Sequence, residues 1–105
     1  MILIEEGPWL DDEIISKLEG LQERLYNYVD VAVNGHLAEK YPGSKGKGVV
    51  IRLDCYDTPE KAVKEFYDRF TKYIASAEEI QRDIRNKAFI KSLEFEYSRG
   101  TLKES

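Results

Sequence analysis

The stretch that decides the fold is VVIRLDCYDTPE, residues 49–60. Its first eight residues alternate between two sets of side chains, which is the period of a β-strand with one buried face. Thr58-Pro59 then predicts the start of a helix, because proline suits the first helical turn. One face of the predicted strand is apolar and the other is mixed: Val49, Ile51, Leu53 and Cys55 against Val50, Arg52, Asp54 and Tyr56.

The segment that follows carries an apolar stripe at helical spacing, which predicts a helix packed along one side. Ile80 and Ile84 prolong the stripe, so the helix either runs to about Asn86 or breaks near Ser76. Residues 89–97 then alternate again and predict a final strand. The helical stripe consists of Val63, Phe66, Tyr67, Phe70, Tyr73, Ile74 and Ala77.

Upstream of the central strand, Ile2-Leu3-Ile4 predicts a short strand that ends before Gly7-Pro8. A second amphipathic helix is expected from an N-cap at Asp11 to Asn34-Gly35. The glycine-rich loop at residues 43–48 leads into a strand, whereas a phosphate-binding loop leads into a helix. We therefore interpret it as a connector.

The expected order is strand, helix, strand, helix, strand in one domain over residues 1–98, with a flexible tail at 99–105. Since every element has one apolar face, we predict an α+β fold of two layers, with two helices on one face of a three-stranded sheet. The other face would be open, as antiparallel or mixed sheets tolerate. That open face would carry Val50, Arg52, Asp54, Tyr56, Ile90, Ser92, Glu94 and Glu96.

Several of these segments resemble a family of small uncharacterised bacterial proteins. The shared pattern is a helix with L-Q-E-x-L-x-x-Y (residues 21–28), a Tyr41-Pro42 turn, and K-G-[KR] leading into a V-V-I strand (residues 45–51). The resemblance spans roughly residues 2–75 and implies the fold and a bacterial origin, but no activity. In size and charge the chain is also similar to immunity proteins that neutralise bacterial toxins.

Composition limits the classes of function. The chain has 105 residues and a net charge of −4, and residues 1–39 alone carry nine acids against Lys17 and Arg24. Such a balance argues against nucleic-acid binding and suits a basic partner. No apolar run approaches the roughly 20 residues of a membrane helix, so no membrane role is expected. A lone cysteine, Cys55, is typical of a reducing cytoplasm.

We expect no enzymatic activity, cofactor or metal. The chain holds one His and one Cys, too few for a zinc site and poorly placed for a nucleophile with its own base. Cys55 falls on the apolar face of its strand and is interpreted as a buried structural thiol. His36 follows a helix C-terminus, where capping or exposure is more common than catalysis.

The first helix has an acidic line opposite its apolar stripe. Asp12, Glu19, Glu23 and Asp30 lie seven, four and seven residues apart, which keeps them close to one line on a helix. A solvated face is the ordinary explanation, and a docking surface for a basic partner is the functional one. With the open sheet face, the candidate partner-binding residues are Asp12, Glu19, Glu23, Asp30, Arg52, Asp54, Tyr56, Glu94 and Glu96.

The leading hypothesis is therefore a cytoplasmic, non-enzymatic binding protein for a basic protein, in its concrete form an immunity protein against a cationic toxin such as a nuclease. The alternative is a structural or homo-oligomeric domain that uses its open sheet face or an edge strand. A third hypothesis, an enzyme or small-ligand binder, has the least support from the sequence.

Overall fold

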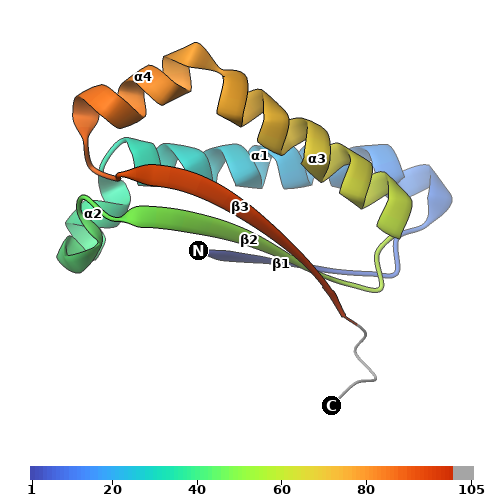
Figure 1. Cartoon of the computed structure of the whole chain (residues 1–105). Coiled ribbons are helices and arrows are strands. Elements are labelled where there is room, and N and C mark those ends of the chain that lie inside the picture. Colours follow the sequence, from blue (N-terminus) through green and yellow to red (C-terminus); the bar gives the residue numbers. More distant parts are fainter. Residues whose placement is uncertain (101–105) are drawn as a thin grey trace.

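The computed structural model describes residues 1–100 and shows one curved sheet with helices packed on one side (Figure 1). The α+β architecture of two layers is as predicted. The strands are β1 (Ile2–Glu6), β2 (Gly48–Tyr56) and β3 (Ser92–Gly100). The α-helices are α1 (Ile14–Val33), α2 (His36–Lys40), α3 (Glu60–Ser76) and α4 (Glu78–Lys87), with 3-10 turns η1 (Asp11–Glu13) and η2 (Pro42–Ser44).

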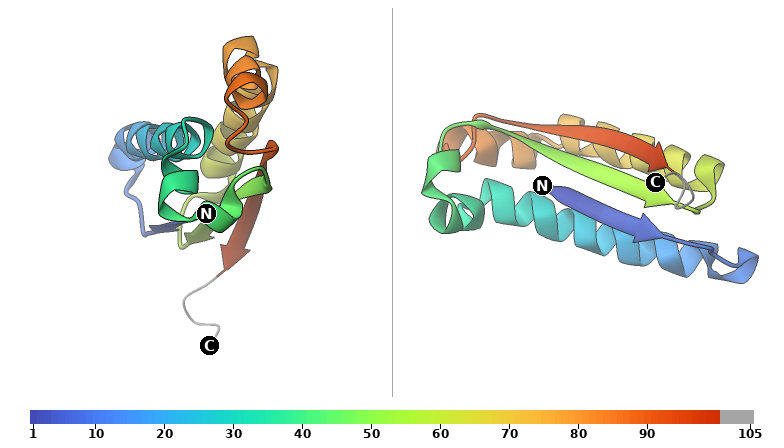
Figure 2. Two further views of the ribbon diagram at one scale, coloured as in Figure 1. Left: turned by 90° about the vertical axis from the view of Figure 1, so that its left-hand side faces the viewer. Right: turned by 90° about the horizontal axis from the view of Figure 1, so that it is seen from below.

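The three strands run parallel in the order β1-β2-β3, so β2 is central. Arg52 on β2 lies beside Ile2 on one side and Glu96 on the other, which sets the register. Both crossovers step in the same direction across the sheet. Because such crossovers are right-handed, both place their helices on the same face, as Figure 2 shows. The open face therefore belongs to an all-parallel sheet rather than to an antiparallel or mixed one.

The ends of several elements differ from the sequence prediction. The segment at Asp11 is a 3-10 turn and not the start of α1, and the Glu13 carboxylate there accepts a hydrogen bond from the Leu10 N–H at 3.0 Å. For the second long helix, the alternative of a break near Ser76 is the correct one, because the extended backbone of Ala77 separates α3 from α4.

The final strand begins at Ser92, three residues later than predicted, and continues to Gly100. Ile90 therefore precedes the strand and is buried, so its assignment to the open face was wrong. Residues 99 and 100 belong to β3 rather than to a tail. The remainder of the predicted tail, residues 101–105, lies outside the described residues.

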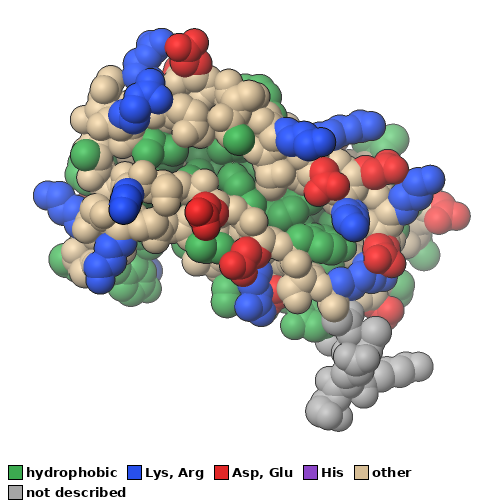
Figure 3. Space-filling model, viewed as in Figure 1, with side chains coloured by type: hydrophobic (Ala, Val, Ile, Leu, Met, Phe, Trp, Pro, Cys, Tyr) green, Lys and Arg blue, Asp and Glu red, His purple; other side chains and the backbone are tan. Residues whose placement is uncertain are grey.

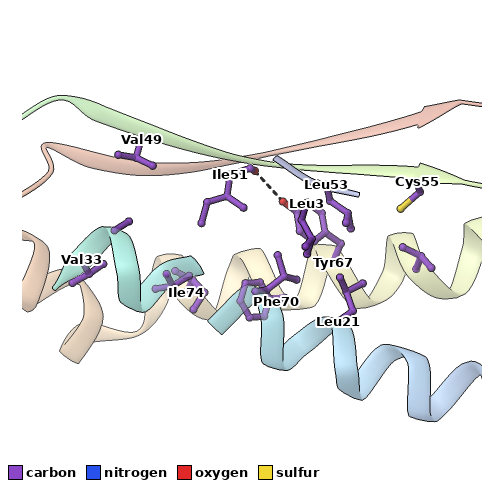
Figure 4. Packing of buried hydrophobic residues seen from close by; sticks show 14 of the residues in the cluster. Leu3, Leu21, Val33, Val49, Ile51, Leu53, Cys55, Tyr67, Phe70 and Ile74 are labelled. Atoms are coloured by element: carbon purple, nitrogen blue, oxygen red, sulfur yellow. Dashed lines mark hydrogen bonds between the residues drawn. The ribbon is translucent and has the colours of Figure 1, made fainter. Parts of the chain in front are cut away.

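The core lies between the sheet and the helices (Figure 4). Its fully buried side chains include Leu21 and Leu25 from α1 and Ile51 and Leu53 from β2. Tyr67 on α3 donates a hydrogen bond from its hydroxyl to the Ile51 carbonyl at 3.1 Å. Burial raises the pKa of Tyr67 far above its ordinary value, so the hydroxyl keeps the proton that it donates. This bond ties α3 directly to the central strand.

Phe70 joins the two long helices to the sheet. Its ring makes edge contacts with Tyr26 of α1, at 5.1 Å between centroids, and with Phe95 of β3, at 5.8 Å. Only 5% of Phe70 is exposed. The aromatic stripe of α3 is therefore mainly core at this position.

Phe70→Ala should lower the free energy of unfolding by about 3–5 kcal/mol, because it removes a large buried ring and leaves a cavity. Tyr73→Ala is the matched control, since Tyr73 lies on the same helix and is 55% exposed; its loss should stay below about 1 kcal/mol. Urea unfolding followed by circular dichroism measures both. Equal losses for the two variants would contradict this account of the core.

Candidate protein interface

The open face of the sheet is a mixed apolar and acidic surface. Ile2 and Ile4 of β1 are 54% and 53% exposed and lie beside Arg52 and Asp54 of β2, and half-buried Val50 and Tyr56 lie on the same face of β2. The strand register places Glu94 beside Val50 on this face. Exposed apolar side chains interspersed with charged ones can form a protein interface.

The charges on this face are unevenly balanced. Arg52 donates two hydrogen bonds to Asp54, at 2.6 and 2.9 Å, so these two side chains form a bidentate pair. Those hydrogen bonds and the charge of Asp54 raise the pKa of Arg52, and Glu96 adds to the shift. Among the described residues, no ion pair is formed by the exposed carboxylates of Glu6, Glu94 and Glu96. The Arg52 and Asp54 charges cancel and those three glutamates remain, so the side chains of this face carry a net charge of −3.

The predicted acidic line on the first helix is only partly continuous. Asp12 lies in the 3-10 turn before α1, so it does not share the helical line. Glu19 and Glu23 lie together on the outer surface of α1. Asp30 instead accepts a hydrogen bond from Asn34 and lies at the groove between α1 and α4. All four carboxylates are exposed, as predicted.

The structure separates the two sets of candidate residues. The apolar side of α1, with Leu21 and Leu25, packs on the sheet, so Glu19 and Glu23 face away from it. The second set lies on the open face of the sheet, away from the helices, and consists of Arg52, Asp54, Tyr56, Glu94 and Glu96. A flat partner surface cannot contact both sets together. They are alternative sites.

Two features of the acidic residues escaped the sequence analysis. Glu5, one of the nine acids of residues 1–39, has a buried side chain that faces the helices and forms an ion pair with Arg24 of α1. The alternation of β1 contained this signal, because Leu3 and Glu5 share a face. Glu79 and Asp83 of α4 join Asp30 around a groove of about 410 Å³ lined by Val29 and Ile80.

The residues that could perform catalysis are not gathered into a site. Cys55 is buried on the helix-facing side of β2, as predicted, whereas His36 is exposed at the start of α2. Burial raises the pKa of the Cys55 thiol, although its contacts with Thr58, Arg99 and Tyr97 act in the opposite direction. Within residues 1–100, no group of three or more His, Cys, Asp or Glu side chains is placed to hold a metal ion.

Native Cys55 should resist a thiol reagent such as 5,5′-dithiobis(2-nitrobenzoate) at mildly alkaline pH. The raised pKa leaves less thiolate than a free cysteine has at the same pH, and burial blocks access. In concentrated guanidinium chloride the same thiol should react at once, with one equivalent per chain. The absorbance of the released thiolate measures both rates. Rapid reaction of the folded protein would show that the cysteine is accessible and activated.

These observations define a small two-layer α+β protein with one uncovered, acidic sheet face. The chain belongs to a family of unknown function, DUF6572, whose model matches residues 1–86. No curated protein and no solved structure matches the chain. Within the described part of the chain, none of the helices combines the length and the apolar character needed to cross a membrane.

Proposed function

We propose that this chain is a non-enzymatic binding protein that recognises a basic protein partner through the open face of its sheet. The observation that carries the proposal is an all-parallel sheet with one uncovered face of net charge −3. Parallel sheets are nearly always covered on both faces. The exposed Ile2 and Ile4 give a partner apolar area to bury, and the carboxylates around them select a basic partner.

The charges would act mainly on the rate of association. Glu6, Glu94 and Glu96 lie on one face without ion partners among the described residues, so they attract a cationic surface before contact. The Arg52–Asp54 pair satisfies its own charges and would offer planar hydrogen-bonding edges at the centre. Tyr56 is suited to anchor the contact, since tyrosine is enriched among residues that dominate binding energy.

In its concrete form, the proposed partner is a cationic bacterial toxin, such as a nuclease, and this chain is the cytoplasmic immunity protein that neutralises it. The small size and acidic surface of the chain support this form, because an acidic face can cover a groove that binds nucleic acid. We expect the neighbouring gene to encode the basic toxin, since an immunity gene directly follows the gene of its toxin.

A matched pair of triple variants tests the surface. The partner is first captured from a lysate of the source organism, identified and purified. Glu6→Gln, Glu94→Gln and Glu96→Gln together should slow its association at low salt by roughly tenfold or more, because steering contributes about 10- to 1,000-fold to such rates. The difference from wild type should shrink as salt is raised. Stopped-flow or interferometry measures the rates.

The control replaces Glu19 and Glu23 on the outer surface of α1 by Gln, and Asp12 in the 3-10 turn before α1 by Asn. It removes the same number of charges and should leave the association rate near that of wild type. Slowing by the control alone would assign recognition to the first helix. Equal rates for wild type and both variants at low salt would overturn electrostatic recognition by either surface.

The alternative function is a homo-oligomer built on the open face, and the exposure of Ile2 and Ile4 favours it. Two copies placed face to face would, however, bring a charge of −3 against a charge of −3. Such a dimer should therefore strengthen as salt screens the repulsion. Sedimentation equilibrium over a range of salt concentrations measures this, and we expect a monomer throughout. A dimer that strengthens with salt would favour the homo-oligomer.

A further inference from the structure

The β3 strand is an edge of the sheet, and its outer side is not paired within the described residues. The sheet order β1-β2-β3 leaves β3 bonded to β2 alone over nine residues. Exposed edges of this length pair readily with another strand, and proteins commonly protect them with proline, bulges or a covering segment. Among residues 1–100, β3 contains no proline and pairs with β2 in an unbroken register, and the protection that it carries is the charge of Glu94, Glu96 and Arg99.

A groove lies beside this edge. It has a volume of about 540 Å³ and runs between α3 and β3. Phe95 and Tyr97 are only half-buried on the helix-facing side of β3, and Tyr67, Thr71 and Ala75 of α3 form the opposite wall. Figure 3 shows hydrophobic side chains in the hollow between α3 and β3, with acidic side chains over the strand below it. Asp68, Lys72 and Glu94 also line the groove, which leaves it with one acidic charge in excess.

The two sides of the sheet at β3 therefore favour different side chains in a strand that is added to this edge. A strand added here would place alternate residues beside Phe95 and Tyr97, where apolar side chains would enter the groove. The residues between them would lie on the open face, beside Glu94 and Glu96. Lysine or arginine is favoured there, because opposite charges on paired strands stabilise a sheet.

The same charges disfavour a second copy of this chain. A two-fold symmetric pairing of edges is antiparallel, and centring it on Phe95 would place Glu94 opposite Glu96 twice. Like charges directly opposite each other are destabilising. In this register the acidic positions oppose self-pairing and still admit a basic strand.

We propose that β3 binds an extended segment of the basic partner as a fourth strand, with alternating apolar and basic residues. This inference rests on the proposed function and assigns a mode of recognition to it. Main-chain hydrogen bonds along the edge would supply affinity, and the groove and the two glutamates would supply specificity.

A synthetic peptide tests the proposal without the natural partner. The probe is a capped nine-residue peptide of alternating Lys and Val, added to isotope-labelled protein at low salt. We expect it to slow hydrogen exchange of alternate β3 amides by about tenfold or more, because the added strand protects the outward N–H groups. A peptide with Glu in place of Lys should not bind. A Lys–Val peptide with every backbone nitrogen methylated should not bind either, although its side chains and charge are unchanged.

Charge variants locate the binding site. Glu94→Gln with Glu96→Gln should weaken binding of the Lys–Val peptide by roughly 2- to 30-fold, the range expected from two cross-strand charge pairs. Glu19→Gln with Glu23→Gln is the matched control and should bind as wild type does.

Binding of the methylated peptide as tightly as the parent, without protection of β3, would overturn strand addition while leaving charge recognition by the open face intact. Amides of β3 that are already protected in a dimer of the free protein would assign the edge to a second copy and also overturn the proposal. A peptide that binds as proposed, combined with partner association that is insensitive to Glu6, Glu94 and Glu96, would contradict the proposed function and not the strand site.

Discussion

The parallel pairing of β2 with both of its neighbours is the constraint on which the rest of this structure depends. Each parallel pair needs a crossover, and each crossover is a long amphipathic helix. Because the strand order follows the chain order, both crossovers return over the same face. All of the helices therefore pack on one face of the sheet. The uncovered face, the exposed β3 edge and the separation of the acidic sets are direct consequences.

The helical layer covers the sheet unevenly. Tyr67 and Phe70 hold α3 against β2 and β3 through a buried hydrogen bond and edge-to-face contacts. Beyond Ala77 the chain turns, and α4 contacts α1 rather than the outer part of β3. The aromatic side chains of β3 are consequently half-covered. The β3 edge therefore retains partly exposed apolar surface beside α3.

The order of elements and their buried faces could be predicted because alternation in residues 49–56 and the helical stripes are local properties. The order and direction of the strands could not be predicted, since they depend on crossovers between distant segments. The break near Ser76 could be named as one of two alternatives but not chosen over a continuous helix, because Ile80 and Ile84 continue the stripe without interruption. Among the candidate residues, exposure of Glu94 and Glu96 followed from alternation. The placement of Asp12 failed because a 3-10 turn replaced the first helical turn.

The loops that follow β1 and β2 touch at Gly7, which donates its N–H to the Tyr56 carbonyl at 2.7 Å. A β-carbon at this position would lie 1.8 Å from the Asp57 carbonyl oxygen, a backbone atom that cannot move aside alone. In a saturation screen for partner binding, substitutions at Gly7 would therefore lose signal through reduced protein abundance. Dividing the binding signal of each variant by its cellular abundance would identify such positions, and the remaining positions would be those that affect recognition of the partner.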